Sequence, residues 1–412
     1  MSNTIELLAP AGGMEALKAA LRFGADAVYG GMKRYGLRAY AGNFAPDELK
    51  EAVRLTHYQK RKFYVTMNAL PRDEELPGFL SAAQETLSTG VDAAIVADLG
   101  AALLLRQKLP ALPLHISTQA NVLNSVTAMH LMESVNARRI ILSRELSLCQ
   151  IRQLRQNLPE ALELEAFVHG AMCVSYSGRC LLSAALTGRV ANQGECAQPC
   201  RWQYQLVEQK RPDEPITLTE DEHGSYLLSA PDLCMLPHLD ELADAGLSSL
   251  KIEGRMKTAY YVATVVSAYR RALDLLLGEG PRAFRAAVPR LMEELEKASH
   301  RASNTGFYYG APQPVAGADG FTQSMEYVGD IVEGAAAGGL ATVRLKNRFF
   351  VSDRLEALTP EGAKPFTVEE IRLKDTGESV PTAGVAGTVL CLRVPFAVEA
   401  GDLLRGPNRN HR

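Results

Sequence analysis

Four of the seven cysteines lie within one 28-residue stretch, and their type and spacing suit metal chemistry. They are Cys173, Cys180, Cys196 and Cys200, with the spacing C-x6-C-x15-C-x3-C. Four thiolates on glycine-containing loops can surround a tetrahedral zinc ion or an iron–sulfur cluster. Zinc sites usually pair cysteines across two to four intervening residues, so the x6 pair favours iron–sulfur, with zinc or no metal as the alternatives.

The remaining three cysteines have different surroundings. Cys149 lies in a helical pattern and Cys391 in a strand-like run, and we predict that both are buried core thiols. Cys234 follows the cluster in the same part of the chain and could replace one of the four ligands. We expect a reducing compartment, in which this clustering favours metal over disulfides.

A second set of polar residues could bind a small anionic ligand. Arg38, Arg144 and Arg255 each come after a short apolar run, and a guanidinium group binds carboxylates or phosphates in a bidentate manner. Asn68 and Gln119 follow two other runs. The alternative is that these arginines form structural ion pairs.

Two further residues are candidates for proton transfer. His169 adjoins the cysteine cluster and could act as an acid or base or tune a metal, although a structural histidine is an equal alternative. Glu253 comes directly after another apolar run and is the second candidate.

The order of the predicted elements would bring these side chains together. Eight short apolar runs alternate with amphipathic helical patterns over the first 255 residues, which favours a parallel (β/α)₈ barrel, with an open doubly wound sheet as the alternative. In a barrel, functional groups gather where the strands end. The predicted strands are Ile5–Ala9, Ala27–Gly30, Phe63–Met67, Ala93–Ala97, Leu114–Ser117, Ile140–Leu142, Leu164–Val168 and Leu250–Ile252.

The rest of the chain breaks this pattern twice. An insertion at 169–249, after the seventh strand, contains the cysteine cluster and a predicted hairpin of Trp202–Glu208 with Ile216–Thr219. After two helical stretches and a linker at 301–320, a small all-β barrel domain is predicted by short alternating runs at Met325–Val332, Leu340–Leu345, Arg354–Leu358, Phe366–Leu373 and Thr388–Arg393. We therefore expect a catalytic domain at 1–300 and a β-domain at 321–412.

Composition excludes several classes of protein. Hydrophobic residues make up 47% of the chain and charged residues 22%, and no apolar run reaches the length of a membrane span. The net charge of −3 does not indicate a general nucleic-acid binder. The first residues lack a secretory pattern, so we expect a cytoplasmic protein. We find no H-E-x-x-H, G-x-S-x-G, P-loop or G-x-G-x-x-G motif.

One long segment resembles a known family signature. Glu165-Ala-Phe-Val-His-Gly-Ala-Met-Cys173, followed by Gly178-Arg-Cys-Leu-Leu-Ser183, is similar to the signature of the collagenase-like peptidases, family U32. Asn192-Gln-Gly-Glu-Cys196 and Ser249-Leu-Lys-Ile-Glu-Gly-Arg255 extend the resemblance, which covers nearly the whole chain. Within the family, the combination resembles the bacterial tRNA hydroxylation branch.

This resemblance implies a function and a cofactor. It implies oxygen-independent synthesis of 5-hydroxyuridine at the tRNA wobble position, with prephenate as co-substrate and a 4Fe-4S cluster on the four clustered cysteines. Prephenate is a dicarboxylate, which would suit Arg38, Arg144 and Arg255 together with Lys251. The β-domain would help to dock the anticodon loop. The alternatives are hydroxylation of a ribosomal RNA cytidine or of a ubiquinone precursor, and, from another class, a collagenase-like peptidase.

Overall fold

The computed structural model describes residues 5–37, 41–173, 175–202, 220–221, 224–225, 231–310 and 321–409. Eight parallel strands form a closed barrel, because the last one pairs in parallel with both the first and the seventh. Closure confirms the barrel over the open sheet. The strands are β1 (Glu6–Pro10), β2 (Ala27–Gly31), β3 (Lys62–Met67), β4 (Ala93–Val96), β5 (Leu114–Ile116), β6 (Ala137–Ile141), β7 (Glu163–Ala171) and β11 (Ser249–Ile252).

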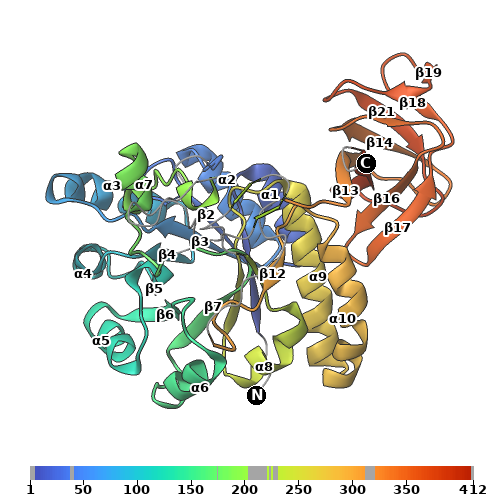
Figure 1. The fold of residues 1–412 in the computed structure, drawn as a ribbon. Helices are drawn as coiled ribbons and strands as arrows, with labels where there is room; N and C mark the ends of the chain where they lie inside the picture. Colours follow the sequence, from blue (N-terminus) through green and yellow to red (C-terminus); the bar gives the residue numbers. More distant parts are fainter. Residues whose placement is uncertain are drawn as a thin grey trace, which may run out of the picture.

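Helices surround this barrel and cover its apolar outer face (Figure 1). Local signals set their ends: Asp98 accepts a hydrogen bond from the Ala101 amide at 2.7 Å, and Gly24 has a φ of 99° just after a helix. The helices of the barrel are α1 (Met14–Arg22), α2 (Pro46–Tyr58), α3 (Leu76–Ser88), α4 (Leu99–Lys108), α5 (Ser125–Val135), α6 (Leu148–Gln156), α8 (Leu239–Asp244), α9 (Ala259–Gly278) and α10 (Pro281–Leu295).

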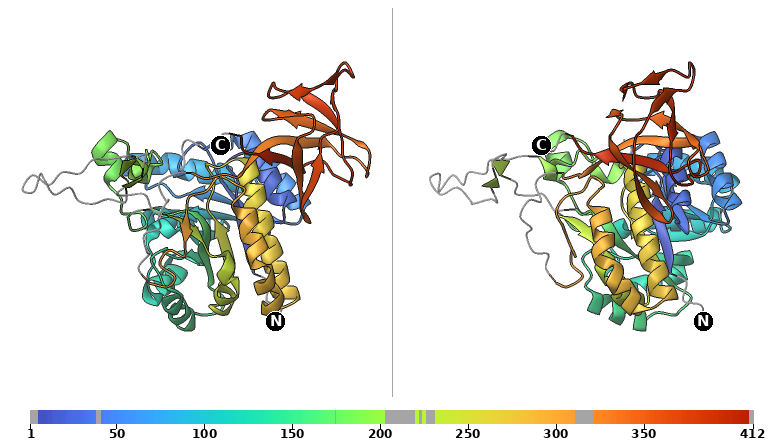
Figure 2. Two further views of the ribbon diagram at one scale, coloured as in Figure 1. Left: turned by 45° about the vertical axis from the view of Figure 1, so that its right-hand side comes forward. Right: turned by 90° about the vertical axis from the view of Figure 1, so that its right-hand side faces the viewer.

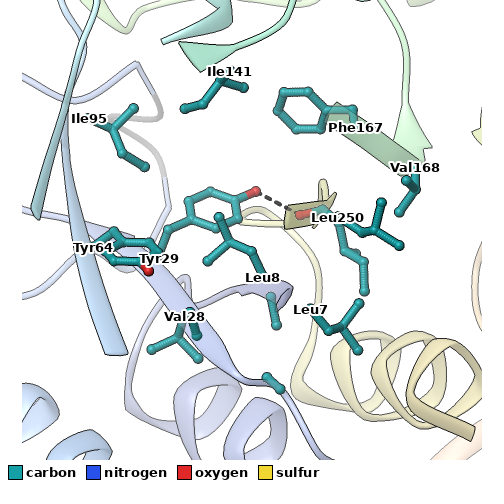
Figure 3. Packing of buried hydrophobic residues seen from close by; sticks show 14 of the residues in the cluster. Leu7, Leu8, Val28, Tyr29, Tyr64, Ile95, Ile141, Phe167, Val168 and Leu250 are labelled. Atoms are coloured by element: carbon teal, nitrogen blue, oxygen red, sulfur yellow. Dashed lines mark hydrogen bonds between the residues drawn. The ribbon is translucent and has the colours of Figure 1, made fainter. Parts of the chain in front are cut away.

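Large side chains fill the barrel interior (Figure 3). Tyr29, Tyr64 and Phe167 come from three different strands, and all are at least nine-tenths buried. The Tyr29 hydroxyl donates a hydrogen bond of 2.9 Å to the Ile252 carbonyl and so ties β2 to β11. The interior is therefore a packed core, open to a ligand only at its end.

The insertion after β7 adds short elements on one side of the barrel. β10 (Asp232–Cys234) pairs antiparallel with β7, and β12 (Ser303–Asn304) pairs with β10. Before β10 come α7 (Leu182–Thr187) and two short 3₁₀ turns, η3 (Ala191–Gln193) and η4 (Pro199–Arg201), and the small strand pair β8 (Glu220–Asp221) and β9 (Gly224–Ser225). Apart from Trp202, the predicted hairpin lies outside the described residues.

The C-terminal part is an antiparallel all-β domain, as predicted. Its main sheet has the order β17-β16-β22-β13-β14-β21-β18-β19, and β15 pairs with β20. The predicted run Phe366–Leu373 is divided between two strands. The strands are β13 (Met325–Glu333), β14 (Leu340–Leu345), β15 (Phe349–Phe350), β16 (Arg354–Thr359), β17 (Gly362–Thr367), β18 (Ile371–Leu373), β19 (Ser379–Val380), β20 (Thr382–Ala383), β21 (Val389–Arg393) and β22 (Leu403–Pro407).

This domain lies beside α9 and α10 in all views (Figures 1 and 2). Arg405 on β22 is fully buried and donates hydrogen bonds to Glu294 of α10 at 2.6 Å and to Glu356 of β16 at 2.8 Å. The rings of Tyr260 and Tyr327 stack across the same interface. Among the described residues, no helix is both long and apolar enough to cross a bilayer.

Candidate active site at the barrel mouth

A cavity of about 480 Å³ lies at the end of the barrel where the strands finish, here called the mouth cavity. Six of the predicted ligand-binding or catalytic residues line it, although they come from four different strand ends. Its lining residues are Tyr29, Leu37, Thr66, Asn68, Ile95, Ser117, Thr118, Gln119, Ile141, Arg144, Phe167, Lys251, Glu253 and Arg255. Arg38 lies outside the described residues and remains a prediction.

Arg144 is held flat against the cavity wall. Its guanidinium carbon lies 3.9 Å from the centre of the Phe167 ring, and Nη1 donates a hydrogen bond of 3.1 Å to the Ala171 carbonyl. Stacking on an aromatic face is a favourable arrangement for a guanidinium group. Arg144 is therefore held in the wall of the mouth cavity, where the sequence predicted it.

Arg255 is much more enclosed. It is only 4% exposed, and it donates hydrogen bonds to the Thr66 hydroxyl at 2.8 Å and to the Asn43 side-chain oxygen at 2.5 Å. A Cβ atom on Gly31 would lie 2.3 Å from its Nη2 atom, so only glycine leaves room for this side chain. Arg255 lines the mouth cavity as a fixed positive charge.

Lys251 forms the floor of the cavity. Its ammonium group donates to Glu165 at 2.8 Å and lies 4.4 Å from the centre of the Tyr29 ring. Burial lowers the pKa of Lys251, while the Glu165 carboxylate opposes this effect. Lys251 is thus a buried ion-paired cation that borders the ligand space.

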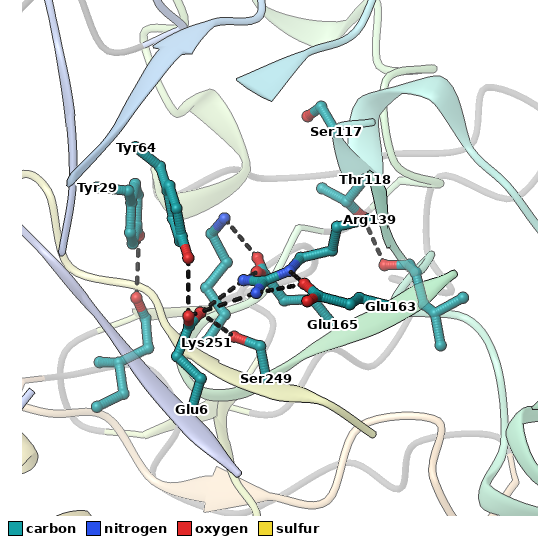
Figure 4. Close-up of polar contacts among 12 residues, drawn as sticks. Glu6, Tyr29, Tyr64, Ser117, Thr118, Arg139, Glu163, Glu165, Ser249 and Lys251 are labelled. Atoms are coloured by element: carbon teal, nitrogen blue, oxygen red, sulfur yellow. Dashed lines mark hydrogen bonds and ion pairs between the residues drawn. The ribbon is translucent and has the colours of Figure 1, made fainter. Parts of the chain in front are cut away.

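A network of buried charges supports Lys251 from below, and sequence reasoning missed it (Figure 4). Arg139 is 2% exposed and bonds Glu6 at 2.5 Å and Glu165 at 2.9 Å. Burial acts to raise the pKa of Glu6, but the charge and hydrogen bonds of Arg139 outweigh it and lower that pKa. Tyr64 and Ser249 also donate hydrogen bonds to Glu6. Glu6 and Arg139 therefore stay ionised inside the barrel, because each favours the charged form of the other.

Glu253 and Asn68 complete the polar lining. Glu253 is the one carboxylate among the described residues that line the mouth cavity, which suits it to proton transfer. The Asn68 side-chain oxygen accepts a hydrogen bond from the Leu37 amide at 3.2 Å and so positions the loop after β2. Asn68 therefore has a structural role in addition to its place in the lining.

His169 does not line the mouth cavity, and its predicted catalytic role there is not supported. A register shift between β7 and β11 at Lys251/Ile252 breaks the strand alternation, so Phe167 lines the mouth cavity and His169 lines a second cavity. Its ring contacts Tyr261 and Tyr269. Burial is the main cause that lowers the pKa of His169 to about 3, and the charges of His300 and Lys257 act in the same direction. It is a neutral, structural histidine.

The four clustered cysteines line a cavity of about 920 Å³ next to the mouth cavity, here called the cysteine cavity. Four lining residues are common to both: Leu37, Thr118, Gln119 and Arg144. None of the four cysteines is in a disulfide. The insertion thus places all four thiols in a cavity that shares Arg144 and Gln119 with the mouth cavity.

Contacts with three barrel loops hold the cysteine insertion over the mouth. The Ser177 amide donates to the Glu145 carboxylate at 2.8 Å, and the Leu70 amide donates to the Asn192 carbonyl at 3.1 Å. Gly178 has a φ of 74°, and a Cβ atom there would lie 2.4 Å from the Gln119 carbonyl oxygen. Only glycine allows this close approach.

The donor chemistry of the cysteine cavity fits an iron–sulfur cluster better than a hard metal ion. No aspartate, glutamate or histidine lines it among the described residues, so cysteine is the only strong ligand type. Soft thiolates select iron–sulfur clusters, zinc or copper(I). In the described residues, no three His, Cys, Asp or Glu side chains are gathered closely enough to hold a metal ion. The residue types therefore fit an iron–sulfur cluster, and binding one would require the four thiols to move closer together.

The other cysteines are placed clearly. Cys234 is 6% exposed and lines the second cavity with His169, so it is separated from the four clustered thiols. Burial raises the pKa of the Cys234 thiol. The prediction that Cys149 is buried was wrong: it is exposed, because Leu148 and Ile151 form the buried face of α6. Cys391 is only half-buried, so the prediction that it is a buried core thiol was also wrong; Leu390 and Leu392 point inward on β21.

Comparisons with known proteins agree with the resemblance described above. The sequence model of "Peptidase family U32" matches residues 12–316, and that of "Peptidase family U32 C-terminal domain" matches residues 323–405. The tRNA hydroxylation protein P of Escherichia coli (strain K12) is 36% identical, over 96% of this chain and 94% of that protein.

Two other relatives have different names. The 23S rRNA 5-hydroxycytidine synthase of Escherichia coli (strain K12) is 37% identical, over 74% of this chain and 45% of that protein. The collagenase of Porphyromonas gingivalis (strain ATCC BAA-308 / W83) is 29% identical, over 90% of each chain.

Proposed function

The chain belongs to peptidase family U32, and from this membership we propose that it is an RNA hydroxylase acting on tRNA. More specifically, we propose that it hydroxylates C5 of the wobble uridine without molecular oxygen. One observation carries the proposal: a cavity lined by four cysteines lies beside the mouth cavity, which is lined by two arginines and a lysine, and Arg144 and Gln119 line both. The names of the relatives that match almost the whole chain give the substrate class.

An iron–sulfur cluster would be the cofactor. Cys173, Cys180, Cys196 and Cys200 would hold it, and we propose the 4Fe-4S form. Such a cluster supplies one-electron transfer or a Lewis-acidic iron. Arg144, which lines the same cavity, would offset the negative charge of a thiolate-ligated cluster.

Prephenate would occupy the mouth cavity as co-substrate. Its two carboxylates need at least two cations, and Arg144, Lys251 and Arg255 all line this cavity, with Arg38 as a further predicted contact. Gln119 and Asn68 would orient the ligand by hydrogen bonds. Glu253 would accept or donate the proton that moves during hydroxylation, because it is the one carboxylate among the described residues that line this cavity.

The RNA target must present its base unstacked. An anticodon loop does this at a lower energetic cost than a duplex, which supports the wobble position as the target. The β-domain would help to dock the tRNA. Hydroxylation of a ribosomal RNA cytidine is the second candidate, because a relative with that name is 37% identical over three-quarters of this chain.

A peptidase has less support from the residues. No histidine lines the mouth cavity or the cysteine cavity in the described part of the chain, so neither holds a thiol–imidazole or hydroxyl–imidazole pair. Gelatin cleavage by the purified protein that persists after Cys173→Ala and Cys180→Ala, with contaminating protease excluded, would favour the peptidase.

The decisive experiment is nucleoside mass spectrometry of tRNA from a strain that lacks the gene. We expect 5-hydroxyuridine derivatives to disappear and to return with the wild-type gene, but not with Cys196→Ala. Unchanged derivatives would reject the proposal. Anaerobic purification tests the cofactor separately: we expect a brown protein containing iron and sulfide, and a colourless zinc protein would reject the cluster.

A further inference from the structure

Four large apolar side chains are exposed in the segment that carries the four clustered cysteines. Tyr176 is 57% exposed, Leu181 77%, Leu186 50% and Trp202 44%, and together they are here called the rim patch. Exposed apolar residues are common singly, but four of them within 27 residues indicate a binding surface. The rim patch is separate from the core clusters of the barrel and the β-domain.

The rim patch borders the cysteine cavity. Tyr176 precedes Ser177, and Leu181 lies between Cys180 and Leu182, all three of which line that cavity. The chain therefore turns one side chain inward and its neighbour outward. The Trp202 amide donates to the Pro199 carbonyl at 3.0 Å, and α7 packs against η4. These contacts hold Trp202 near α7, which follows Leu181 and contains Leu186.

The part of the insertion that carries the four cysteines, residues 173–202, has a net charge opposite in sign to that of the whole chain. Residues 173–202 contain Arg179, Arg189 and Arg201 against the single acid Glu195, which gives 3 − 1 = +2, whereas the chain has −3. Arg179 is exposed, and its amide bonds to the Tyr176 carbonyl at 3.0 Å. Aromatic rings interspersed with arginines are the usual surface for unpaired nucleotides.

We propose that the rim patch is a stacking platform for an unpaired RNA loop, on which Tyr176 and Trp202 contact bases and the exposed Arg179 contacts phosphates. This inference rests on the proposed function, since it supplies the contact surface for the RNA. It places the loop at the opening of the cysteine cavity, where a base that leaves the stack can reach the mouth cavity. An apolar protein partner would not need the arginines.

The sole tryptophan of the chain is the probe for the test. Because Trp202 is the only one, tryptophan fluorescence of the full-length, anaerobically purified protein reports on this surface alone. A synthetic anticodon stem-loop should quench it saturably, and a fully paired RNA duplex of equal length should quench it much less. The affinity should fall as salt rises, because phosphates are bound.

Matched variants separate stacking from simple apolar contact. Tyr176→Leu should weaken stem-loop binding about 5- to 100-fold, whereas Tyr176→Phe should keep it, because only the ring stacks. Filter binding tests Trp202→Leu and Trp202→Phe in the same way. Tyr58→Leu is the control, since this 83% exposed tyrosine ends α2 at the opposite end of the barrel. It should bind like wild type.

The results also distinguish this inference from the proposed function. If both leucine variants bind the stem-loop as tightly as wild type, the platform is overturned. Concentration-dependent self-association that buries Trp202, with no response to RNA, would also overturn it and assign the patch to a second copy. If tRNA hydroxylation is unaffected in the gene deletion but ring-dependent RNA binding persists, the platform stands and the proposed reaction fails.

Discussion

At the scale of single residues, Arg144 is the side chain that links the two cavities. It stacks on Phe167, bonds to the Ala171 carbonyl and lines both the mouth cavity and the cysteine cavity. Arg255 and Lys251 are positively charged too, but of the two cavities they line only the mouth cavity. Arg144 is therefore the cation at which substitution should affect both cavities.

We expect Arg144→Lys to lower kcat/KM for the anionic co-substrate by about 30-fold. Lysine keeps the charge but loses the planar stack and the bidentate edge, a loss of about 2 kcal/mol. Steady-state hydroxylation assays at varied co-substrate concentration would measure it. Arg54→Lys, on the exposed surface of α2, is the control. Equal activity of Arg144→Lys and wild type would remove Arg144 from the ligand site.

Buried His169 should make the fold sensitive to acid. Its folded pKa of about 3 lies below the ordinary value of 6.5, so the unfolded chain takes up a proton first as pH falls, and the stability contribution is lost from about pH 6.5 downward. Between pH 6.5 and 5 this loss is about 2 kcal/mol. His169→Gln should remove that part of the pH dependence in urea unfolding.

A control and a second histidine define this measurement. His115 is also buried, and burial lowers its pKa well below 6.5, so the variant should keep part of the acid sensitivity. The exposed His130 on α5 provides the matched substitution. A His169→Gln protein with the full wild-type dependence would show that His169 is charged in the fold.

At the scale of elements, the mouth depends on how loops from different strands dock. Glu145 after β6, Gln119 after β5 and Leu70 after β3 all contact the cysteine insertion. Below them, the carboxylates and cations of β1, β6, β7 and β11 form one buried network. The buried network holds the strands beneath the mouth cavity, and the loops hold the cysteine insertion above it.

Gly178→Ala should detach the insertion from the barrel mouth. The added Cβ would meet the Gln119 carbonyl oxygen, whereas Gly188→Ala, at a φ of 71°, meets nothing within 4 Å. Both carry the same left-handed backbone cost of about 1 kcal/mol, so their difference isolates docking. We expect faster proteolysis within 173–202 and less bound iron for Gly178→Ala only. Identical behaviour of the two variants would contradict this role.

At the scale of the whole molecule, the barrel and the β-domain are joined by polar contacts around a buried arginine. Arg405 bonds Glu294 and Glu356, and Lys297 bonds the same two carboxylates. On another part of the interface, Arg22 of α1 bonds Asp402 at 2.8 Å. The two parts should therefore unfold together, and the β-domain is held in a fixed position beside the barrel.

Arg405→Met should weaken the interface between the barrel and the β-domain. Two partly buried carboxylates would lose a partner, which costs about 3 kcal/mol. We expect calorimetry to show a lower Tm and a split into two transitions. Arg409→Met is the control, because Arg409 is exposed and pairs with Asp353 inside the β-domain. A single unshifted transition for Arg405→Met would show that the interface does not depend on this residue.

The sequence predicted the barrel well because parallel strands buried on both faces are short apolar runs. It did not predict β22, whose run Leu403–Pro407 contains Arg405, a charge that only the neighbouring Glu294 and Glu356 make tolerable in a core. It singled out His169 because this residue adjoins the cysteine cluster, and the register shift beside Lys251 places it in the second cavity instead. It also treated Cys149 as buried, although helix geometry turns it outward.

The sequence by itself determined the family signature, the four-cysteine spacing and the order of strands and helices, because these are local patterns of residue type and periodicity. Tertiary structure alone decided that the barrel closes, that Cys234 lies apart from the four thiols and that Arg144 links the two cavities. Each of these depends on contacts between residues far apart in sequence, such as Lys251 with Glu165 or Ser177 with Glu145. Short-range propensities carry no information on such pairings, and only the packed fold creates them.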